Sequence, residues 1–279
     1  MIVVRTIAEL RTARRGLPGP VGFFPTLGFM HQGHLSLVEQ ARRECASVVA
    51  SIFVNPTQFG PNEDFHRYPR DEERDLAMLA QAGVDLAVLP TVEEMYPGGD
   101  ATRVRVAGLS EVLEGERRPG HFDGVTTVVA KLFNLVQPDR AYFGRKDAQQ
   151  VLIIERMVRD LHFPVTIVRC PTVREPDGLA CSSRNVYLTE AQRSQASSLS
   201  AALRAAEAAF AAGERDAGRL RQLARDQIES QPLASIDYLS LAGEETLHEL
   251  HGRLEVPALL SLMVSFGDTH LIDNTTLAP

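Results

Sequence analysis

Short runs of β-branched and other apolar residues alternate with amphipathic stretches along the first two-thirds of the chain. The runs predict strands, and the helical period of the stretches between them predicts helices. The expected strands are Val21–Phe24, Val48–Val54, Asp85–Leu89, Ala141–Phe143 and Val165–Arg169, and the expected helices include His34–Cys45, Glu72–Ala82, Gly124–Val136 and Ala148–Leu161. This alternation predicts an α/β fold with a Rossmann-like, doubly wound parallel sheet, whose ligands bind beyond the carboxyl ends of the strands.

The pattern changes after about residue 175, where a smaller α+β domain is expected. The elements expected there are a loop over Arg174–Asn185, a long exposed helix over Thr189–Gly213, a second helix near Asp216–Glu229, and strands over Ser235–Leu241 and Val256–Phe266. Thr189-x-x-Gln192 fits a capping box at the start of the long helix. We therefore expect two domains, residues 1–175 and residues 176–279.

The composition argues against several classes of protein. The formal net charge is -7, whereas a general nucleic-acid coat protein has a basic balance. Three scattered cysteines without Cys-x-x-Cys spacing predict neither a disulfide framework nor a structural zinc site. The N-terminus has no long apolar core, and no apolar run approaches the roughly 20 residues that cross a bilayer. We expect a cytoplasmic protein that has neither nucleic acid nor a membrane as its partner.

Two histidines follow the first expected strand. Val21–Phe24 is ended by Pro25-Thr26-Leu27-Gly28, and His31-Gln32-Gly33-His34 precedes an amphipathic run. The histidines therefore lie where a strand passes into a helix N-terminus, whose unpaired N–H groups and dipole favour an anion such as phosphate. This pattern resembles the His-x-Gly-His signature of adenylate-forming nucleotidyltransferases. Half of a zinc site and ordinary helix-cap residues remain as alternatives.

Two later loops carry cations. Gly144-Arg145-Lys146-Asp147 follows another expected strand and opens a helix, and its Lys146 is a mobile point charge suited to phosphate oxygens. The small, polar segment Gly178–Asn185 contains Arg184 and resembles the flexible Lys-Met-Ser-Lys-Ser loop of the same superfamily. Taken singly, a charged turn or a Ser-Ser-Arg-Asn stretch is also ordinary solvated loop chemistry.

Taken in order, these motifs and several others resemble the pantothenate synthetase family nearly from end to end. The matching segments are Pro25-Thr26-x-Gly28-x-x-His31-x-Gly33-His34, Ser51-Ile52-Phe53-Val54-Asn55-Pro56-x-Gln58-Phe59, Tyr68-Pro69-Arg70, Arg118-Pro119-Gly120-His121-Phe122-x-Gly124-Val125, Lys131-Leu132-Phe133-Asn134, Lys146-Asp147-x-Gln149-Gln150, Asp177-Gly178-Leu179-Ala180-x-Ser182-Ser183-Arg184-Asn185 and Leu271-Ile272-Asp273-Asn274.

The resemblance implies a ligase that condenses pantoate with β-alanine through a pantoyl-adenylate and releases AMP and pyrophosphate. ATP would be its co-substrate, Mg²⁺ its metal and a homodimer its assembly. The first expected domain would bind ATP and pantoate, and the second would act as a lid over the reactive adenylate.

The resemblance also assigns residues by position. His34 would be the catalytic proton donor, and His31, Lys146 and Arg184 would be further catalytic donors. The ATP site would comprise Pro25, Thr26, Leu27, Gly28, Phe29, Met30, His31, Gln32, Gly33, His34, Gly144, Arg145, Lys146, Asp147, Val173, Cys181, Ser182, Ser183 and Arg184. The substrate site would comprise Gln58, Gln150, Phe53, Asn55 and Tyr68, and Asp75 would take the acidic position associated with the metal.

The sequence departs from the family pattern at a few of these positions. Arg145 stands where the family usually has glutamate, which reverses a charge beside Lys146. Leu27 and Met30 exchange methionine and leucine at nearly constant volume, so we expect mild effects. The rival interpretations are another nucleotidyltransferase or a fragment of a class I aminoacyl-tRNA synthetase, and a nucleotide-binding protein without activity.

Overall fold

The chain forms two units, and the computed structural model describes residues 1–61 and 63–278 of it. The N-terminal unit comprises Met1–Arg145 and Gln149–Pro171, and the C-terminal unit comprises Lys146–Ala148 and the chain from Thr172 onward. Three residues that include Lys146 therefore belong to the C-terminal unit, although the sequence on both sides of them belongs to the N-terminal unit.

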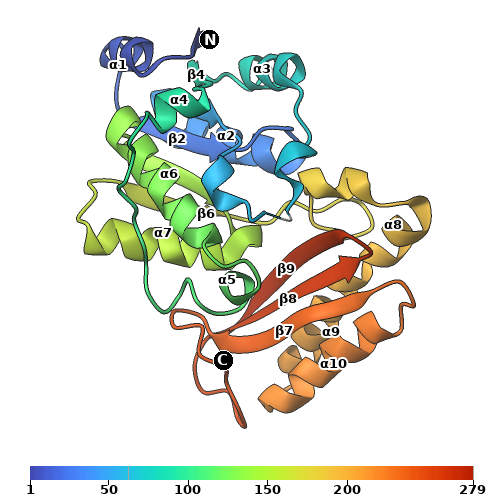
Figure 1. The fold of residues 1–279 in the computed structure, drawn as a ribbon. Helices are drawn as coiled ribbons and strands as arrows, with labels where there is room; N and C mark the ends of the chain where they lie inside the picture. Colours follow the sequence, from blue (N-terminus) through green and yellow to red (C-terminus); the bar gives the residue numbers. More distant parts are fainter. Residues whose placement is uncertain (62, 279) are drawn as a thin grey trace. The chain divides into compact units, whose positions relative to one another are not determined.

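Six parallel strands form the central sheet of the N-terminal unit (Figure 1). They are β1 (Ile2–Val4), β2 (Val21–Thr26), β3 (Ser47–Ile52), β4 (Leu86–Val88), β5 (Arg140–Gly144) and β6 (Thr166–Cys170), and they lie in the order β1-β4-β3-β2-β5-β6. Every neighbouring pair runs parallel. The predicted parallel α/β sheet is confirmed, and β1 is an additional strand that the hydrophobic pattern did not predict.

Neighbouring side chains of β2 pack on opposite faces of the sheet, as the two-residue period of a strand requires. Phe24 belongs to the core that α2 (Gln32–Glu44) and α3 (Glu72–Gln81) cover. Phe23 faces α6 (His121–Val136), where its ring centroid lies 6.4 Å from that of Phe133. The sheet is therefore covered by helices on both faces, as expected of a doubly wound fold.

The other elements of this part of the chain are shorter or lie at its edges. They are the helices α1 (Ile7–Arg15), α4 (Val92–Met95), α5 (Glu114–Arg117) and α7 (Ala148–Asp160), and the 3₁₀ turns η1 (Pro56–Gln58), η2 (Asp64–His66) and η3 (Arg145–Asp147). The helices predicted from the sequence correspond to α2, α3, α6 and α7 and end close to the expected residues.

The C-terminal unit is built from helices and a three-stranded antiparallel sheet of order β7-β8-β9. Its elements are η4 (Ser183–Tyr187), α8 (Glu190–Ala196), α9 (Ser198–Ala211), α10 (Ala217–Glu229), β7 (Ser235–Gly243), β8 (Ala258–Phe266) and β9 (Thr269–Leu277). The predicted α+β character is confirmed, and β9 is a strand that the sequence pattern did not predict.

The single long exposed helix expected over Thr189–Gly213 is wrong in two respects. The structure divides it at Ser197 into α8 and α9, and the capping box of Thr189 and Gln192 starts the shorter one. In addition, α9 is part of the core, because its apolar side chains recur with the helical period and pack with β8 and α10. Its buried apolar residues are Leu199, Ala202, Leu203, Ala206 and Phe210.

Candidate functional site

The order of the strands reverses beside β2. From β2 the chain continues to β3 on one side, whereas β5 pairs with β2 on the other side. Loops that leave two such strands diverge, and ligands of open parallel sheets bind at this point, beyond the carboxyl ends. The loop from Leu27 to His31 follows β2, and Gly144 ends β5, so both expected nucleotide loops begin where the topology favours a ligand.

The loop after β2 makes a tight turn that requires glycine at its centre. The hydroxyl of Thr26 accepts a hydrogen bond from the Gly28 amide at 3.0 Å. Gly28 has φ +94°, and a Cβ there would lie 3.0 Å from both a carboxylate oxygen of Asp75 and Cγ2 of Ile52. Phe29 also adopts a positive φ, 52°. The turn is therefore held in a conformation that L-residues rarely adopt, immediately before the two histidines.

Asp75 of α3 braces this turn. Its Oδ2 accepts a hydrogen bond from the Phe29 amide at 2.6 Å, and its Oδ1 accepts one from the Met30 amide at 2.7 Å. The residue is 1% exposed. Burial raises the pKa of the Asp75 carboxyl, against the opposing effect of the two amide hydrogen bonds. The neighbouring Arg74 adds a bond from its guanidinium to the Met30 carbonyl at 3.0 Å.

This geometry fits a brace for the loop better than a metal ligand, because backbone amides engage both carboxylate oxygens of Asp75. Among residues 1–61 and 63–278, no group of three or more His, Cys, Asp and Glu side chains could hold a metal ion. The same finding gives no support to the zinc alternative for His31 and His34. The metal role of Asp75 stays a prediction.

The two histidines come together at the start of α2. His31 is the N-cap residue of the helix, and the His34 amide donates to the His31 carbonyl at 2.9 Å. Their rings stack with centroids 3.9 Å apart and an interplanar angle of 21°. The ring of His34 also lies against Phe24, at 5.7 Å between centroids. Two imidazoles therefore stand together at a helix N-terminus, where backbone N–H groups and the helix dipole favour an anion.

Gln58 lies in η1, directly against α6. An added Cβ on Gly124 would lie 2.4 Å from the Thr57 carbonyl oxygen and 2.7 Å from the Gln58 Cα. The amide nitrogen of Asn55 donates to the Gly124 carbonyl at 3.1 Å and to Oε1 of Gln58 at 3.2 Å. Glycine at position 124 therefore allows the close backbone approach that places Asn55 and Gln58 together.

His121 and Arg118 hold the same turn from the other side. His121 Nδ1 lies 2.8 Å from the Gln58 carbonyl oxygen, and its Nε2 lies 3.1 Å from Nη1 of Arg118. A carbonyl only accepts and a guanidinium only donates, so this imidazole is neutral with its proton on Nδ1. Burial lowers the pKa of His121, and the adjacent Arg118 charge lowers it further. The segment Arg118–Val125 thus positions the residues around Gln58.

The other expected substrate residues of the N-terminal unit are buried or half-buried. Phe53 is 7% exposed, and its amide donates to the Thr26 carbonyl at 3.0 Å, so it follows β3 beside the end of β2. Tyr68 is 6% exposed and packs edge-on against Phe59 at 5.9 Å between centroids. Gln150 is half-buried in α7, next to a fully engaged Gln149 whose amide bonds the carbonyls of Leu109 and Val112.

The C-terminal unit carries Lys146. The side-chain amide of Asn274 in β9 donates to the Lys146 carbonyl at 2.7 Å. The Lys146 ammonium lies 3.5 Å from a carboxylate oxygen of Asp147. Arg145, which belongs to the N-terminal unit and replaces the glutamate usual in the family, has an exposed side chain.

The remaining expected nucleotide residues lie in a hairpin of the C-terminal unit and in η4, which follows it directly. The Cys181 amide donates to the Val173 carbonyl at 2.9 Å, which brings these two residues side by side. Ser182 caps η4 through a bond from the Arg184 amide to its hydroxyl, 3.3 Å, and Ser183 is buried. Arg174, inside the hairpin, forms a two-pronged ion pair with the fully buried carboxylate of Asp273 at 2.6 and 3.0 Å.

The positioning roles of several residues were not predicted from the sequence. For Asp75 the resemblance implies a metal role, and its hydrogen bonds to the loop were not predicted. No role was predicted for His121 or Asn274, although both lie in matching motifs. For His121 and Asn274 a signal was present, because each lies in a segment that matched the family pattern. What the sequence lacks is the partner of each side chain.

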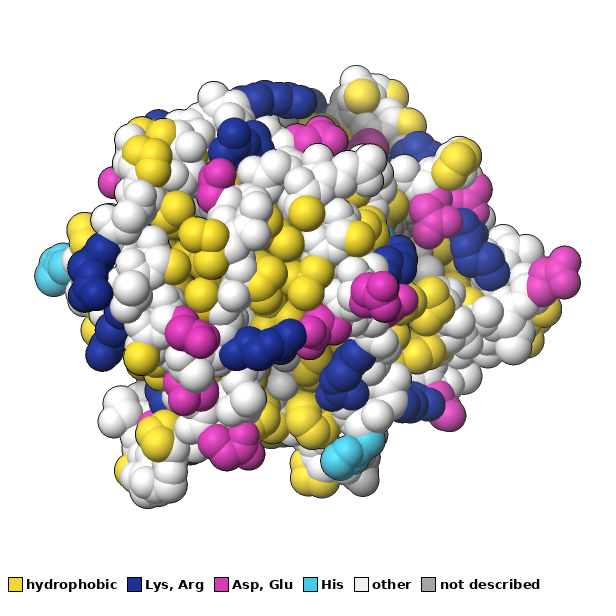
Figure 2. Space-filling model, turned by 90° about the horizontal axis from the view of Figure 1, so that it is seen from above, with side chains coloured by type: hydrophobic (Ala, Val, Ile, Leu, Met, Phe, Trp, Pro, Cys, Tyr) yellow, Lys and Arg dark blue, Asp and Glu magenta, His cyan; other side chains and the backbone are white. Residues whose placement is uncertain are grey.

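The face seen in Figure 2 shows acidic and basic side chains interspersed, with apolar atoms between them. No helix among the described residues combines the length and the apolar character that crossing a membrane requires. On this face the cations are not gathered into one basic field, which agrees with phosphate being bound by a few local donors.

Comparison with known proteins gives full-length matches. A family model described as Pantoate-beta-alanine ligase matches residues 2–276. Pantothenate synthetase of Chloroflexus aurantiacus is 59% identical over 277 residues, which cover 99% of this chain and 98% of that protein. The crystal structure of pantothenate synthetase from Thermus thermophilus matches with a TM-score of 0.96 and 53% identity, with 100% of both chains covered.

A crystal structure of pantoate-beta-alanine ligase from Francisella tularensis, complexed with Beta-gamma ATP and β-alanine, has a TM-score of 0.80 and 34% identity. The match covers 99% of this chain and 97% of the Francisella tularensis chain. The reversed strand order and the paired histidines at the start of α2 define a nucleotide-binding α/β protein. With these matches, the chain belongs to the pantoate–β-alanine ligase family, as the sequence resemblance predicted.

Proposed function

We propose that this chain condenses pantoate with β-alanine at the expense of ATP, through a pantoyl-adenylate, and releases AMP and pyrophosphate. The observation that carries the proposal is the stacked pair His31 and His34 at the N-terminus of α2, behind a loop braced by Asp75, in a chain of this family. A helix N-terminus with adjacent imidazoles suits a phosphate-bearing substrate.

In the first step, a pantoate carboxylate oxygen attacks the α-phosphorus of ATP, and the bond to pyrophosphate breaks. The chemistry requires positioning and donors for the charge on the leaving pyrophosphate, and no covalent protein nucleophile. His34 acts as proton donor, with His31 beside it, and Lys146 and Arg184 add charge. The hydroxyls of Ser182 and Ser183 supply neutral donors, and Cys181 serves as a packing contact.

In the second step, the neutral amine of β-alanine attacks the acyl carbon and a carbon–nitrogen bond forms. AMP leaves as the carbon–oxygen bond breaks, and the proton lost by the amine passes to water. AMP is the better leaving group, because a free carboxylate would have to expel oxide. Gln58 and Gln150 bind pantoate, and Asn55, Phe53 and Tyr68 shape the same site. Leu27 and Phe53 offer apolar surface for the methyl groups of pantoate.

The remaining proposed ATP contacts lie in both units. They are Pro25, Thr26, Leu27, Gly28, Phe29, Met30, Gln32 and Gly33 in the N-terminal unit, with Gly144 and Arg145, and Asp147 and Val173 in the C-terminal unit. The C-terminal unit acts as a lid in this proposal, because it carries Lys146 and Arg184 and forms a compact unit of its own. Mg²⁺ accompanies the phosphates of ATP, as it commonly does at ATP sites. We further propose that the protein is cytoplasmic and forms a homodimer.

Release of AMP from ATP by the purified protein tests this function, with Mg²⁺ present and pantoate and β-alanine added separately and together. The expected result is one AMP and one pantothenate per turnover only with both substrates, and loss of both products in His34→Ala. ATP binding without AMP release under any combination would instead indicate a nucleotide-binding protein without activity. Exchange of pyrophosphate that depends on an amino acid in place of pantoate would indicate another nucleotidyltransferase.

A further inference from the structure

The side-chain amide of Asn55 has a fixed orientation, because backbone groups of opposite polarity hold its two ends. Its Nδ2 donates to the Gly124 carbonyl oxygen at 3.1 Å, and its Oδ1 accepts from the Thr57 amide at 3.3 Å. A carbonyl can only accept and a backbone N–H can only donate. The reversed orientation of the buried Asn55 amide would oppose like groups at both ends.

The orientation of Asn55 in turn fixes that of Gln58. Asn55 Nδ2 donates to Gln58 Oε1 at 3.2 Å, so the carbonyl end of the Gln58 amide is the end turned toward Asn55. Gln58 is 8% exposed, and within residues 1–61 and 63–278 its Nε2 has no hydrogen-bond acceptor. The group that Gln58 offers to a ligand is therefore an N–H donor. The matching ligand atom is an acceptor oxygen, such as a carboxylate or a hydroxyl.

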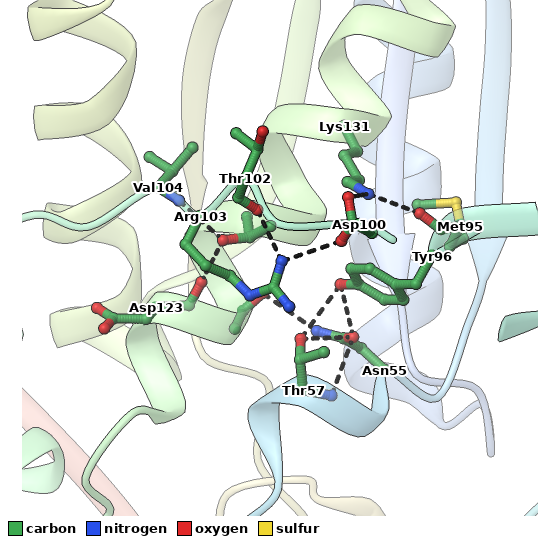
Figure 3. A network of polar contacts seen from close by, with 12 residues as sticks. Asn55, Thr57, Met95, Tyr96, Asp100, Thr102, Arg103, Val104, Asp123 and Lys131 are labelled. Carbon is green, nitrogen blue, oxygen red and sulfur yellow. Dashed lines mark hydrogen bonds and ion pairs between the residues drawn. The ribbon is translucent and has the colours of Figure 1, made fainter. Parts of the chain in front are cut away.

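Tyr96 supplies the shortest hydrogen bond to Asn55 Oδ1. The Tyr96 hydroxyl donates to this oxygen at 2.8 Å, whereas the Thr57 hydroxyl lies at 3.0 Å and the Thr57 amide at 3.3 Å. Figure 3 shows the phenol pointing from its own segment onto Asn55 and Thr57. Burial raises the pKa of Tyr96, so the phenol stays protonated and able to donate.

The ring of Tyr96 is itself held in place. The ammonium of Lys131 lies 4.4 Å from the ring centroid and donates to the Met95 carbonyl at 2.7 Å and to Asp100 at 2.9 Å (Figure 3). A cation over the face of an aromatic ring attracts it. Lys131 lies in α6, the helix that also carries Gly124. The same helix thus fixes the Asn55 amide directly and through Tyr96.

From these contacts we infer that Tyr96 is a positioning residue for substrate recognition: its hydroxyl locks Asn55, and Asn55 turns the Gln58 amide so that its NH₂ group donates to the substrate. The inference rests on the proposed function, in which Gln58 binds pantoate. It adds the polarity of that contact and a residue that does not touch the substrate.

The first test is a double-mutant cycle read in steady-state AMP formation. Tyr96→Phe keeps the ring and removes the hydroxyl, so we expect the KM for pantoate to rise about three- to tenfold, the effect of one hydrogen bond, with the KM for ATP unchanged. In a Gln58→Ala background the same substitution has no further effect on pantoate. Equal effects in both backgrounds would overturn the inference, because the hydroxyl would then act without Gln58.

Tyr142→Phe is the matched control. Tyr142 is buried, whereas Tyr96 is half-buried, and the Tyr142 hydroxyl donates to Glu44 at 2.9 Å, on the α2 side of the sheet. It should lower thermal stability as Tyr96→Phe does and leave the KM for pantoate unchanged. A rise in that KM in the control would mean that loss of any hydrogen-bonded tyrosine hydroxyl of this unit loosens the site, which contradicts a specific role for Tyr96.

Gln58→Glu tests the polarity directly. One carboxylate oxygen can still accept from Asn55, but the other replaces the NH₂ group with a negative acceptor. We expect at least a hundredfold loss of kcat/KM for pantoate, greater than that of Gln58→Ala, because the substrate is itself a carboxylate. Retention of activity near that of the wild type would show that Gln58 offers an acceptor, and the inference would fail.

A stability cycle separates this inference from the proposed function. Tyr96→Phe and Asn55→Ala are each expected to lower the thermal midpoint, and together by clearly less than the sum of their separate shifts. Additive shifts would show that Tyr96 and Asn55 do not interact, whatever the substrate, and would overturn the inference. Should the wild type release no AMP with pantoate while the shifts remain non-additive, the proposed function fails and the positioning contact stands for a different ligand.

Discussion

The side-chain amide of Asn274 donates a hydrogen bond to the backbone carbonyl of Lys146 at 2.7 Å, across 128 positions of sequence. The adjacent Asp273 receives the two-pronged ion pair of Arg174. One strand, β9, thus holds both the segment with Lys146, the lysine proposed to bind phosphate, and the hairpin that precedes Ser182. The segment Leu271–Asn274 has a structural task that its sequence did not reveal.

Removal of the Asn274 amide should impair the use of ATP. In Asn274→Ala the Lys146 carbonyl loses its donor, and the lysine is less well placed for the phosphates. We expect kcat/KM for ATP to fall about tenfold, the equivalent of roughly 1.4 kcal/mol, in steady-state AMP formation with saturating pantoate. The neighbouring Thr275→Val is the control, because the Thr275 hydroxyl bonds Glu207 of α9 instead. An equal loss of ATP use in both variants would contradict a specific role for Asn274.

Asp75→Asn should disturb the loop before His31. The side chain of an asparagine has one acceptor oxygen, which can bond only one of the backbone amides of Phe29 and Met30. Its NH₂ group would face the other amide, and two donors would then oppose each other. We expect a loss of about 2–3 kcal/mol in the free energy of unfolding, the cost of an unsatisfied buried group, measured by denaturant titration. Activity should fall as well.

The same variant distinguishes the brace from a metal ligand. For a brace, the Mg²⁺ concentration that gives half-maximal activity stays as in the wild type, while the maximum falls. A large increase in that concentration, with unchanged stability, would instead support the metal role that the resemblance implied for Asp75.

His121 should make stability depend on pH in the mildly acidic range. Its folded pKa is lowered from the ordinary value of 6.5, so the unfolded chain binds the proton more readily than the folded chain. The contribution of the neutral imidazole is therefore present above about pH 6.5 and is lost as the pH falls toward the folded pKa. His121→Asn keeps a side-chain donor within reach of Gln58 and removes the titration. Chemical unfolding between pH 5 and 8 should give a flatter profile for the variant; identical slopes would refute this origin.

Gly124→Ala should be strongly destabilising. The new methyl group would meet the Thr57 carbonyl and the Gln58 Cα, which are backbone atoms and cannot swing aside. We expect a loss of about 3 kcal/mol in the free energy of unfolding and a rise in the KM for pantoate, because η1 must move. Gly98→Ala is the matched control, since no atom lies within 4 Å of a Cβ at that position. Wild-type stability of Gly124→Ala would show that α6 does not pack as described.

The hydrophobic pattern predicted five of the six parallel strands. Buried parallel strands are rich in apolar residues, and the run Val48–Ala50 in β3 is an example. The pattern missed β1, which lies at the sheet edge and whose Ile2 is 52% exposed. It also missed β9, in which apolar residues are interspersed with polar ones. It also joined α8 and α9, because no glycine or proline marks the break at Ser197. The period of apolar residues predicts the type of one element at a time. It does not predict edge strands or the residue at which one helix ends and the next begins.

Which segments belong to the site stays a prediction from the motifs, and the structure adds which atoms of these segments are in contact. The stacking of His31 and His34 follows from their spacing at a helix start. By contrast, the contact of Asn274 with Lys146 and the contact of Tyr96 with Asn55 join distant segments. Only the register of the folded sheets and the packing of α6 bring such pairs together, and neither is encoded in a local pattern.

The assignment of residues 146–148 to the C-terminal unit has a mechanical consequence. Lys146 is fastened to β9 through Asn274, so any displacement of the C-terminal unit carries the lysine with it. A single cut of the chain after Pro171 cannot free a complete C-terminal unit, because the lysine would stay behind on the other fragment. If the C-terminal unit moves as the proposed lid, the ammonium of Lys146 moves with it, and a probe on this lysine would report that movement.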